Sequence, residues 1–406
     1  MTVKILAVTP GYYPEVGGTA LATYLITDLL AKDERIHLTV LTGVKNPKRI
    51  NGVKYIYDPL LKRIDKRYIP VSQLNRRYGD IIKSNDIVYI VNAFPLIPVA
   101  KRFGKKVIVH LHDYRPISPS AVVLAGTSNL SNFGLLKEGF YTLLIQRRGV
   151  EGLIKNVLNV PYTLQIRRWV CMADTILAVS KRHAEILSKY MPECKDKIKV
   201  LYNPLPKLPR FEKKLEELPT FLYCGGDSYI KGFYILLKVL QILGKRKQTH
   251  FKIILTNKYS HESLDRLNKL KKHYNLNIEV HGIIKHSDLV KSYYSRSWAL
   301  LFPSICEEPL PYTIMEALLT GTLPVASKVG GVPEIVEKTC AEDFLIPPNM
   351  HERLLEAIET ITGYDKRHFE KYFIHNLVNN SSISIKFSEQ KLLKDFLDIL
   401  LTFQAT

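Results

Sequence analysis

The sequence is poor in paired cysteines and in long apolar runs. It has five cysteines, which are Cys171, Cys194, Cys224, Cys306 and Cys340. No two of them form a Cys-x-x-Cys pair, so their spacing indicates neither a zinc site nor a secreted disulfide framework, and a reducing cytosol fits best. No apolar stretch reaches the roughly 18 residues that a membrane-spanning helix needs, and the first one, closed by Pro10 and Gly11, is too short for a signal peptide. These absences predict a cytoplasmic protein.

Acidic residues are also scarce, and their deficit is uneven. The chain has 58 Lys+Arg against 38 Asp+Glu, a net charge of +20. Residues 1–205 hold 31 basic and 15 acidic side chains (31 − 15 = +16), which leaves 27 and 23 (+4) for the remainder. A basic first half predicts an anionic partner, which is a lipid surface, a lipid-linked phosphate acceptor or nucleic acid; the alternative is a general contribution to solubility.

The apolar residues that are present follow the pattern of two successive α/β domains. With 406 residues, the chain is too long for one ordinary hydrophobic core. Apolar, β-branched runs that indicate buried strands lie at 3–9, 37–41, 87–92, 106–112, 175–180 and 199–203, and again at 221–226, 251–256, 278–282 and 299–303. Helical spacing follows at 20–31 and 232–243. This alternation predicts two parallel sheets flanked by helices.

Composition also marks the expected domain boundaries. We expect an N-terminal Rossmann-like domain at 1–203, a linker with prolines and mixed charge at 204–219, a second Rossmann-like domain at 220–384 and an amphipathic helix within 385–406. Residues 115–168 form an irregular insertion that mixes large apolar residues with basic ones. This insertion suits an interfacial helix on an anionic membrane; the alternative is an ordinary amphipathic helix packed on its own domain.

The segment 303–336 holds the strongest candidate for a binding site. It starts at the carboxyl end of an expected strand, where open α/β sheets bind their ligands. Pro311 fits the first position of a helix, so the amides of Tyr312 and Thr313 would face outward at the positive end of that helix. Such a terminus predicts a site for a diphosphate.

Two glutamates flank the start of this helix. Glu308 precedes it, and Glu316 lies within it, one turn beyond Tyr312. Both carboxylates can therefore accept hydrogen bonds from the hydroxyls of a sugar bound over that terminus. For an isolated pair of glutamates, the alternative is that one is a solvated loop residue and the other a helix-face residue.

The whole segment resembles the donor-binding signature of family 4 glycosyltransferases, which are retaining enzymes of the GT-B fold. The matching residues are Glu308 and, after seven residues, Glu316-Ala317, then Gly321-Thr322-Leu323-Pro324-Val325 and Gly330-Gly331-Val332-Pro333-Glu334. The resemblance implies that Glu308 contacts the transferred sugar near the reacting centre, that Glu316 binds the ribose hydroxyls, and that Leu310 to Thr313 bind the diphosphate. Pro311 stands where the family usually has glycine, which removes one amide donor.

A second segment, CGGDSYIKGF at 224–233, is similar to the phosphate clamp Gly-Arg-x4-Lys-Gly of the same family. Lys231 aligns with the lysine, and the resemblance implies that Lys231 neutralises the leaving diphosphate as the glycosidic bond breaks. Gly226 stands in place of the arginine, so half of the cationic clamp is missing, and another basic side chain or a different donor placement would have to compensate. Without the resemblance, Lys231 is interpreted as a solvated side chain.

In the first half, Gly17 and Gly18 resemble the glycine pair of the family's N-terminal loop, which lets the backbone approach donor phosphate or acceptor. His112 with Asp113 matches the family's His-Asp at a strand end, which implies that His112 lies near the donor sugar; His110 is equally interpreted as a packed neighbour. The first loop is not G-x-G-x-x-G, which disfavours an NAD enzyme. Asp-x-Asp is absent from the sequence, so we predict that no metal ion is needed.

The resemblance covers nearly the whole chain, apart from 115–168, the linker and the tail. It implies two Rossmann-like domains facing a central cleft, with the last helix crossing back to the first domain. It also implies a retaining, hexosyltransferase-type enzyme of glycan biosynthesis that uses a nucleoside diphosphate sugar as co-substrate and no other cofactor.

Three residues, Glu308, His112 and Lys231, are expected to be catalytic. The expected acceptor is a glycan or a lipid-linked molecule, with the protein peripheral on the cytoplasmic face of an anionic membrane; nucleic acid is disfavoured because no known basic and aromatic motif is present. The alternatives are a catalytically weakened GT-B-fold binding protein at a membrane surface, a sugar-nucleotide epimerase, and a phosphorylase that would need a pyridoxal-phosphate lysine.

Overall fold

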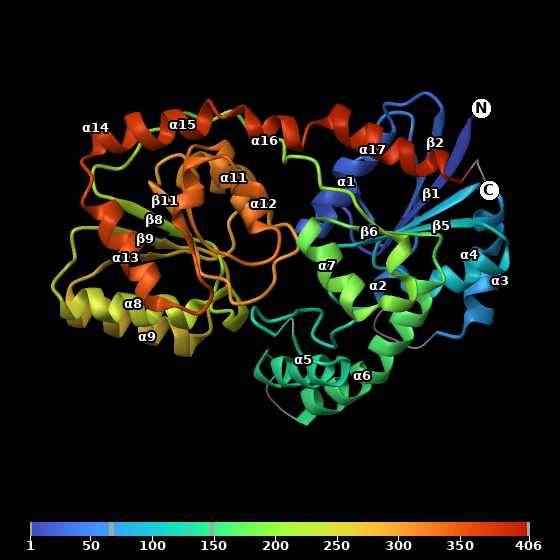
Figure 1. Ribbon diagram of the computed structural model, residues 1–406, viewed down its shortest axis with the longest axis horizontal. Coiled ribbons are helices and arrows are strands. Elements are labelled where there is room, and N and C mark those ends of the chain that lie inside the picture. Colours follow the sequence, from blue (N-terminus) through green and yellow to red (C-terminus); the bar gives the residue numbers. More distant parts are fainter. Residues whose placement is uncertain (1, 65–68, 128, 147–149, 404–406) are drawn as a thin grey trace. The chain divides into compact units, whose positions relative to one another are not determined.

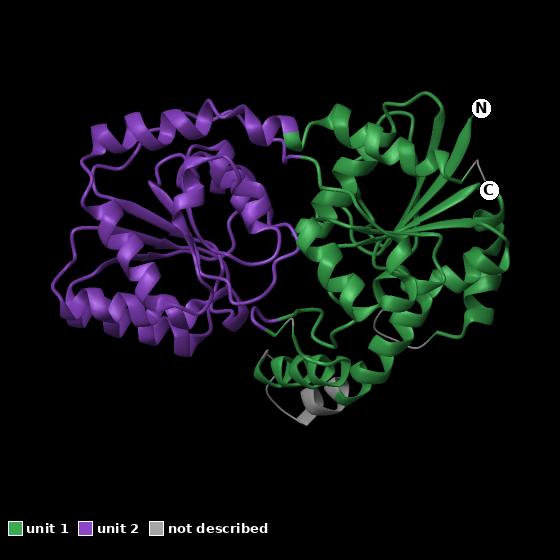
Figure 2. Cartoon of the chain, viewed as in Figure 1, with its two compact units in different colours: residues 1–123, 127–204, 386–406 green, residues 124–126, 205–385 purple. Residues whose placement is uncertain are grey.

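The computed structural model describes residues 2–64, 69–127, 129–146 and 150–403 (Figure 1). Contacts between residues divide the chain into two compact units. Unit 1 consists of Met1–Val123, Thr127–Pro204 and Lys386–Thr406, and unit 2 of Leu124–Gly126 and Leu205–Ile385 (Figure 2). Each unit contains one parallel sheet, which confirms the predicted fold class of two Rossmann-like α/β units.

The sheet of unit 1 has seven strands in the order β3-β2-β1-β4-β5-β6-β7. They are β1 Val3–Thr9, β2 Ile36–Thr42, β3 Lys54–Tyr57, β4 Ile87–Ile90, β5 Lys106–Leu111, β6 Thr175–Ala178 and β7 Ile198–Val200. In the central strand β1, Ile5 pairs with Leu38 of β2 on one side and with Ile87 of β4 on the other. Continuous apolar runs form these strands because helices cover both faces of a parallel sheet.

The helices of unit 1 lie on both sides of this sheet. They are α1 Gly18–Leu30, α2 Leu61–Ile64, α3 Val71–Lys83, α4 Ile97–Arg102, α5 Asn132–Gln146, α6 Val150–Cys171, α7 Lys181–Tyr190 and α17 Glu389–Leu401. Helices α1 and α17 contact each other on one side, and α3, α4 and α6 pack together on the other (Figure 1).

The sheet of unit 2 has six strands in the order β10-β9-β8-β11-β12-β13. They are β8 Thr220–Tyr223, β9 Lys252–Leu255, β10 Asn277–Val280, β11 Ala299–Phe302, β12 Leu323–Ser327 and β13 Leu345–Ile346. Its α-helices are α8 Phe233–Lys245, α9 His261–Tyr274, α10 His286–Leu289, α11 Tyr312–Leu319, α12 Val332–Val336, α13 His351–Thr362, α14 Lys366–Phe369, α15 His375–Val378 and α16 Ser381–Lys386. Helix α8 packs against α9 and α13, and α11 against α12 and α15.

The C-terminal helix α17 belongs to unit 1, although the chain reaches it directly from unit 2. Its buried side chains are Leu392, Phe396, Ile399 and Leu400, spaced as one face of a helix. The ring of Phe396 lies 5.8 Å from that of Tyr89 in β4, and the ring of Phe387 lies 5.2 Å from that of Tyr202. The apolar face therefore packs on the core of unit 1.

The insertion expected to be irregular is mostly helical, since it forms α5 and most of α6, which pack against each other within unit 1. Gly139 of α5 approaches the preceding loop so closely that a Cβ atom there would lie 2.5 Å from Ser118 Oγ. The irregular appearance of the sequence came from apolar residues on both faces of α5. Among the described residues, no helix is both long and apolar enough to span a bilayer.

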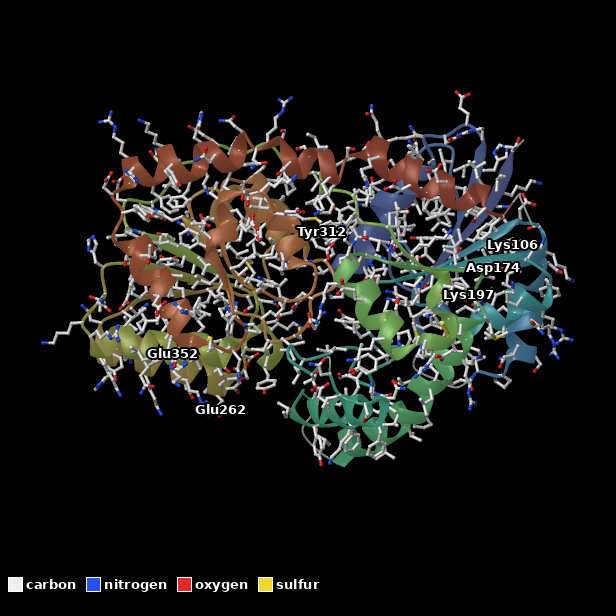
Figure 3. The ribbon with its side chains drawn as sticks, in the orientation of Figure 1. Lys106, Asp174, Lys197, Glu262, Tyr312 and Glu352 are labelled. Atoms are coloured by element: carbon white, nitrogen blue, oxygen red, sulfur yellow. A yellow bond between two sulfur atoms is a disulfide. The ribbon has the colours of Figure 1, made fainter. Side chains whose placement is uncertain are left out.

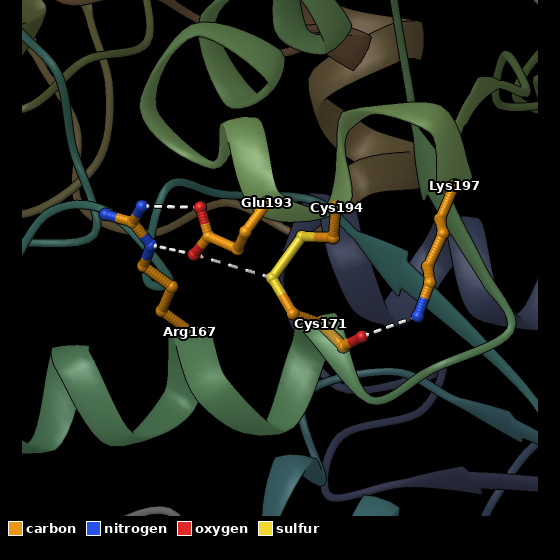
Figure 4. The surroundings of a disulfide bond; sticks show 5 residues. All are labelled: Arg167, Cys171, Glu193, Cys194 and Lys197. Atoms are coloured by element: carbon orange, nitrogen blue, oxygen red, sulfur yellow. Dashed lines mark hydrogen bonds and ion pairs between the residues drawn. A yellow bond between two sulfur atoms is a disulfide. The ribbon is translucent and has the colours of Figure 1, made fainter.

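A disulfide joins Cys171, the last residue of α6, to Cys194 in the turn after α7 (Figure 4). Arg167 donates two hydrogen bonds to the carboxylate of Glu193, at 2.6 and 2.7 Å, and Lys197 donates to the carbonyl oxygen of Cys171. The spacing of cysteines along the chain gave no sign of this pair, because the two residues are 23 positions apart and meet only through the packing of α6 beside the turn.

Candidate functional site

The predicted donor residues of unit 2 gather where the strand order of its sheet reverses, between β8 and β11. Loops that leave neighbouring strands on opposite sides of such a point form a crevice at the carboxyl end of a parallel sheet. The loop after β8 contains Gly226 and Lys231, and the loop after β11 contains Glu308. The sheet thus brings together two segments that are far apart in sequence, since Lys231 and Glu308 are separated by 77 residues.

An ion pair connects these two loops. Lys231 Nζ lies 2.5 Å from Glu308 Oε1. The pair forms because Gly232, with a φ of 77°, lets the chain turn directly against the end of β11, where a Cβ atom would lie 1.9 Å from the carbonyl oxygen of Pro303. The backbone of the two loops is also joined, since Ile305 N donates to the carbonyl oxygen of Ile230 at 2.9 Å.

Glu308 is only 8% exposed, and its carboxylate has further partners. Ser304 Oγ lies 2.8 Å from Glu308 Oε1, and Cys306 Sγ lies 3.4 Å from the same atom. Burial alone would raise the pKa of Glu308, but the charge of Lys231 and these hydrogen bonds hold it below its usual value. Burial alone would lower the pKa of Lys231. The charge of Glu308 outweighs this effect, so the pKa of Lys231 is raised overall. Both side chains are therefore charged at neutral pH.

The glycine pair Gly330-Gly331 holds the backbone of the loop that carries Glu308. Gly331 N donates to the carbonyl oxygen of Glu308 at 2.8 Å, and Gly330 N donates to Glu307 Oε2 at 2.7 Å. Gly330 has a φ of 51°, and a Cβ atom there would lie 1.8 Å from the carbonyl oxygen of Glu308. Only glycine fits, so this motif acts by fixing the position of Glu308 rather than by offering a side chain.

Helix α11 begins one residue later than predicted. Pro311 precedes the helix in an extended conformation, and Tyr312 is its first residue (Figure 3). Leu310 and Tyr312 are buried, and Thr313 follows in the first turn. The positive end of the helix dipole thus lies at the carboxyl edge of the sheet, in the loop that carries Glu308.

At Gly226 the structure leaves no room for the arginine of the clamp that this segment resembles. Its φ is 62°, and a Cβ atom would lie 2.6 Å from the carbonyl oxygen of Lys258. Any side chain at this position requires the loop after β9 to move. Gly226 therefore shapes the loop of Lys231 by close backbone packing and contributes no cationic group.

Glu316 is held by residues that sequence reasoning missed. His286 Nε2 lies 2.8 Å from Glu316 Oε1, and Tyr294 Oη lies 3.4 Å from Glu316 Oε2. His286 is the first residue of α10, and Tyr294 ends the turn of helix that follows it. No motif marks either residue, because they reach Glu316 only through the packing of this segment beside α11.

Three predicted residues lie in unit 1. Gly17 and Gly18 are exposed at the start of α1, and His112 follows β5 directly. Burial lowers the pKa of His112 to about 3, so its ring is neutral at physiological pH. Its Nε2 atom has no hydrogen-bond partner within the described part of the chain, and its ring lies 4.3 Å from that of His110. His112 thus has a neutral ring with one buried nitrogen that is unpaired among the described residues.

Comparison with known proteins supports the interpretation of unit 2. Residues 206–371 match the family model of glycosyl transferases group 1. An uncharacterized glycosyltransferase of Haemophilus influenzae is 31% identical over 161 residues, which are 39% of this chain and 44% of that protein. The uncharacterized glycosyltransferase MJ1607 of Methanocaldococcus jannaschii is 23% identical over 242 residues, or 55% and 59% of the two chains. The chain thus spans about half the length of these curated relatives.

Solved structures show which fold the two units belong to. Sucrose-phosphate synthase from Thermosynechococcus elongatus has a TM-score of 0.67 at 16% identity, covering 99% of both chains. HepE of Anabaena, solved with UDP-glucose, has a TM-score of 0.63 at 17% identity, covering 98% of this chain and all of that one. WaaG, a glycosyltransferase of lipopolysaccharide biosynthesis, has a TM-score of 0.63 at 14% identity over 97% and 99%. The fold is GT-B.

Proposed function

We propose that the protein is a glycosyltransferase that moves a sugar from a nucleoside diphosphate donor to an acceptor hydroxyl with retention of anomeric configuration. The observation that carries this proposal is the Lys231–Glu308 ion pair beside the start of α11, at the point where the strand order of unit 2 reverses. It lies within the residues that match the glycosyl transferase model. We also propose that the chain is of the family 4 type, with unit 1 on the acceptor side.

Each residue of the site has a proposed task. The diphosphate binds at Leu310 to Thr313, where the helix dipole favours negative charge, and Lys231 neutralises the leaving phosphate. Glu308 binds the transferred sugar, and Glu316 binds the ribose. His112 is proposed as a neutral hydrogen-bonding group toward a sugar hydroxyl. No metal ion or further cofactor is needed, since Lys231 and the amides of α11 supply the positive charge.

The proposed reaction is a front-face displacement. The bond between the anomeric carbon and the leaving phosphate oxygen breaks, and the acceptor oxygen bonds to the same face of that carbon. The proton of the acceptor hydroxyl passes to the leaving diphosphate. Lys231 is already held by Glu308, so little reorganisation is required as negative charge develops on the phosphate.

A thermal-shift screen of nucleotide sugars tests this function. UDP-glucose is the first probe, because it is bound in the HepE structure, and other uridine, guanosine and adenosine diphosphate sugars follow. At 100 times its dissociation constant, a donor should stabilise the fold by about 2.7 kcal/mol. Release of nucleoside diphosphate in the presence of an acceptor should accompany the shift. A chain that no donor stabilises contradicts the proposal.

Two results would favour the alternatives. Stabilisation without any release of nucleotide would indicate a binding protein, in which Gly226 and Pro311 mark lost catalysis. Conversion of the donor sugar without an acceptor would indicate an epimerase.

The exposed face of α5 supports a membrane-proximal acceptor. Phe133, Lys137, Tyr141 and Ile145 recur every fourth residue and are all exposed, with Phe133 at 77%. On α6, Val157, Leu158 and Leu164 are also exposed. We propose that this α5–α6 face rests on an anionic bilayer, because large apolar side chains with neighbouring lysine suit the interface and the first half of the chain is strongly basic.

Vesicle sedimentation tests the membrane proposal. The protein should bind vesicles that contain phosphatidylglycerol more strongly than vesicles of phosphatidylcholine alone, and Phe133→Ser with Tyr141→Ser should lower binding about tenfold. The matched control is Val378→Ser with Ile385→Ser, which removes two exposed apolar side chains from unit 2. Equal binding of both double variants contradicts the proposal. Self-association that only the α5 variant loses would assign this face to a second copy instead.

A further inference from the structure

Glu316 is held from both sides by side chains of a neighbouring segment. Glu316 is 6% exposed, and within the described part of the chain each of its carboxylate oxygens has one side-chain partner. His286 Nε2 lies 2.8 Å from Oε1, and Tyr294 Oη lies 3.4 Å from Oε2. Because an ionised carboxylate only accepts hydrogen bonds, both partners must be donors, and Nε2 of His286 must carry a proton.

With these two contacts, Glu316 can still accept further hydrogen bonds from a ligand. A carboxylate accepts about four hydrogen bonds, two at each oxygen. With one position per oxygen taken by His286 or Tyr294, one remains on each. Two parallel acceptors on one carboxylate fit the two adjacent hydroxyls of a ribose, which point in the same direction from the ring.

The contact with His286 is the stronger of the two restraints. It is the shorter one, and the hydrogen bond and charge of Glu316 raise the pKa of His286 above its usual value, although burial opposes this. A larger fraction of His286 is therefore protonated near neutral pH than of a free histidine, which makes the hydrogen bond charge-assisted. The side chain of His286 is 38% exposed, so the contact is not fully enclosed by protein.

We propose that His286 is a positioning residue that orients Glu316 toward the ribose diol and so makes the site select ribonucleotides over 2′-deoxyribonucleotides. The proposal rests on the proposed function, in which Glu316 binds the donor ribose. His286 does not touch the reacting atoms. Without it, the carboxylate keeps only the longer contact with Tyr294 and can turn away from the diol.

The test compares UDP with 2′-deoxyuridine 5′-diphosphate by isothermal titration calorimetry on the full chain. If the thermal-shift screen favours another base, the ribo and deoxyribo diphosphates of that base are used. Wild type should bind the ribonucleotide at least about tenfold more tightly, the usual effect of one hydrogen bond to a charged group. His286→Ala should weaken binding of the ribonucleotide about tenfold more than that of the deoxyribonucleotide, because the ribonucleotide loses both hydroxyl contacts with Glu316 and the deoxyribonucleotide loses only that of its 3′-hydroxyl.

His286→Gln is the control that separates hydrogen bonding to Glu316 from a merely structural role of His286. Its amide nitrogen can donate to Glu316 Oε1 from nearly the same place, so discrimination should be retained in His286→Gln and lost in His286→Ala. Equal weakening of both nucleotides in His286→Ala, or no discrimination in wild type, overturns the inference while donor binding stands. If wild type binds no nucleoside diphosphate, the donor site itself is wrong and this inference falls with it.

Discussion

Replacing Glu308 by glutamine should lower kcat by about 100-fold or more while the fold persists. Glutamine keeps the shape of the side chain and one acceptor oxygen, but it removes the charge that Lys231, Ser304 and Cys306 surround. Losing one preorganised electrostatic group from an active site commonly reduces kcat by a factor of about 10² to 10³. The measurement is the rate of nucleotide release with the donor found by the thermal-shift screen, in the presence of EDTA to test for metal independence.

A matched variant separates this effect from the general loss of a buried ion pair. Glu279→Gln removes a carboxylate that is also paired with a lysine of unit 2, Lys252, at 2.7 Å, but on the edge strand β10. Its turnover should stay within about threefold of wild type, since surface-accessible pairs contribute about 1 kcal/mol or less to stability. Turnover near the wild-type level in Glu308→Gln as well would remove Glu308 from the reaction.

Replacing Lys231 by methionine should also reduce kcat by about 100-fold, with a smaller change in the KM for donor. The reason is that the charge on the leaving diphosphate grows as the glycosidic bond breaks, so a cation beside it stabilises the transition state more than the bound donor. Lys252→Met is the control, because it also removes a lysine paired with a glutamate in unit 2. A Lys231→Met enzyme that changes only the KM would show that the lysine binds donor without assisting catalysis.

The same variant should alter the pH dependence of the reaction. Lys231 holds the pKa of Glu308 below its usual value against the effect of burial. In Lys231→Met the burial remains and the attraction is lost, so the pKa of Glu308 rises. The acid limb of kcat/KM should therefore move to higher pH, and Glu308→Gln should lack that limb. An acid limb that stays in place in Lys231→Met would indicate that another group controls it.

Much of the fold was predictable because parallel strands leave a strong signal. A strand buried on both faces is a continuous apolar run, and β1, β5 and β8 were found on that basis. The strand β12 was missed because Pro324, paired with Leu300 of β11, is normally absent from central strands. The strands β3 and β13 lie at the edges of their sheets and were also missed. The four residues of β3 are exposed or only partly buried, so they form no continuous apolar run, and β13 is only two residues long.

Some residues of the candidate site were also predictable from the sequence, and others were not. Glu308 and Glu316 were predicted from one motif and Lys231 from another, because each motif is a pattern of residue types at a fixed spacing within one segment. Ser304, Cys306, Tyr294 and His286 were not predicted, because each acts through a contact with one of these carboxylates and not through a local pattern.

The sequence by itself determined that the chain forms two parallel α/β units, and it placed the candidate donor-binding residues in the second. Periodicity and motif spacing are local properties of the chain, so they can be read without coordinates. Only the tertiary structure decided that Gly226 has no room for a side chain, that Cys171 meets Cys194, and that His286, which no motif marks, contacts Glu316. These three depend on distances between segments far apart in sequence, and such distances are set by packing, which no local pattern records.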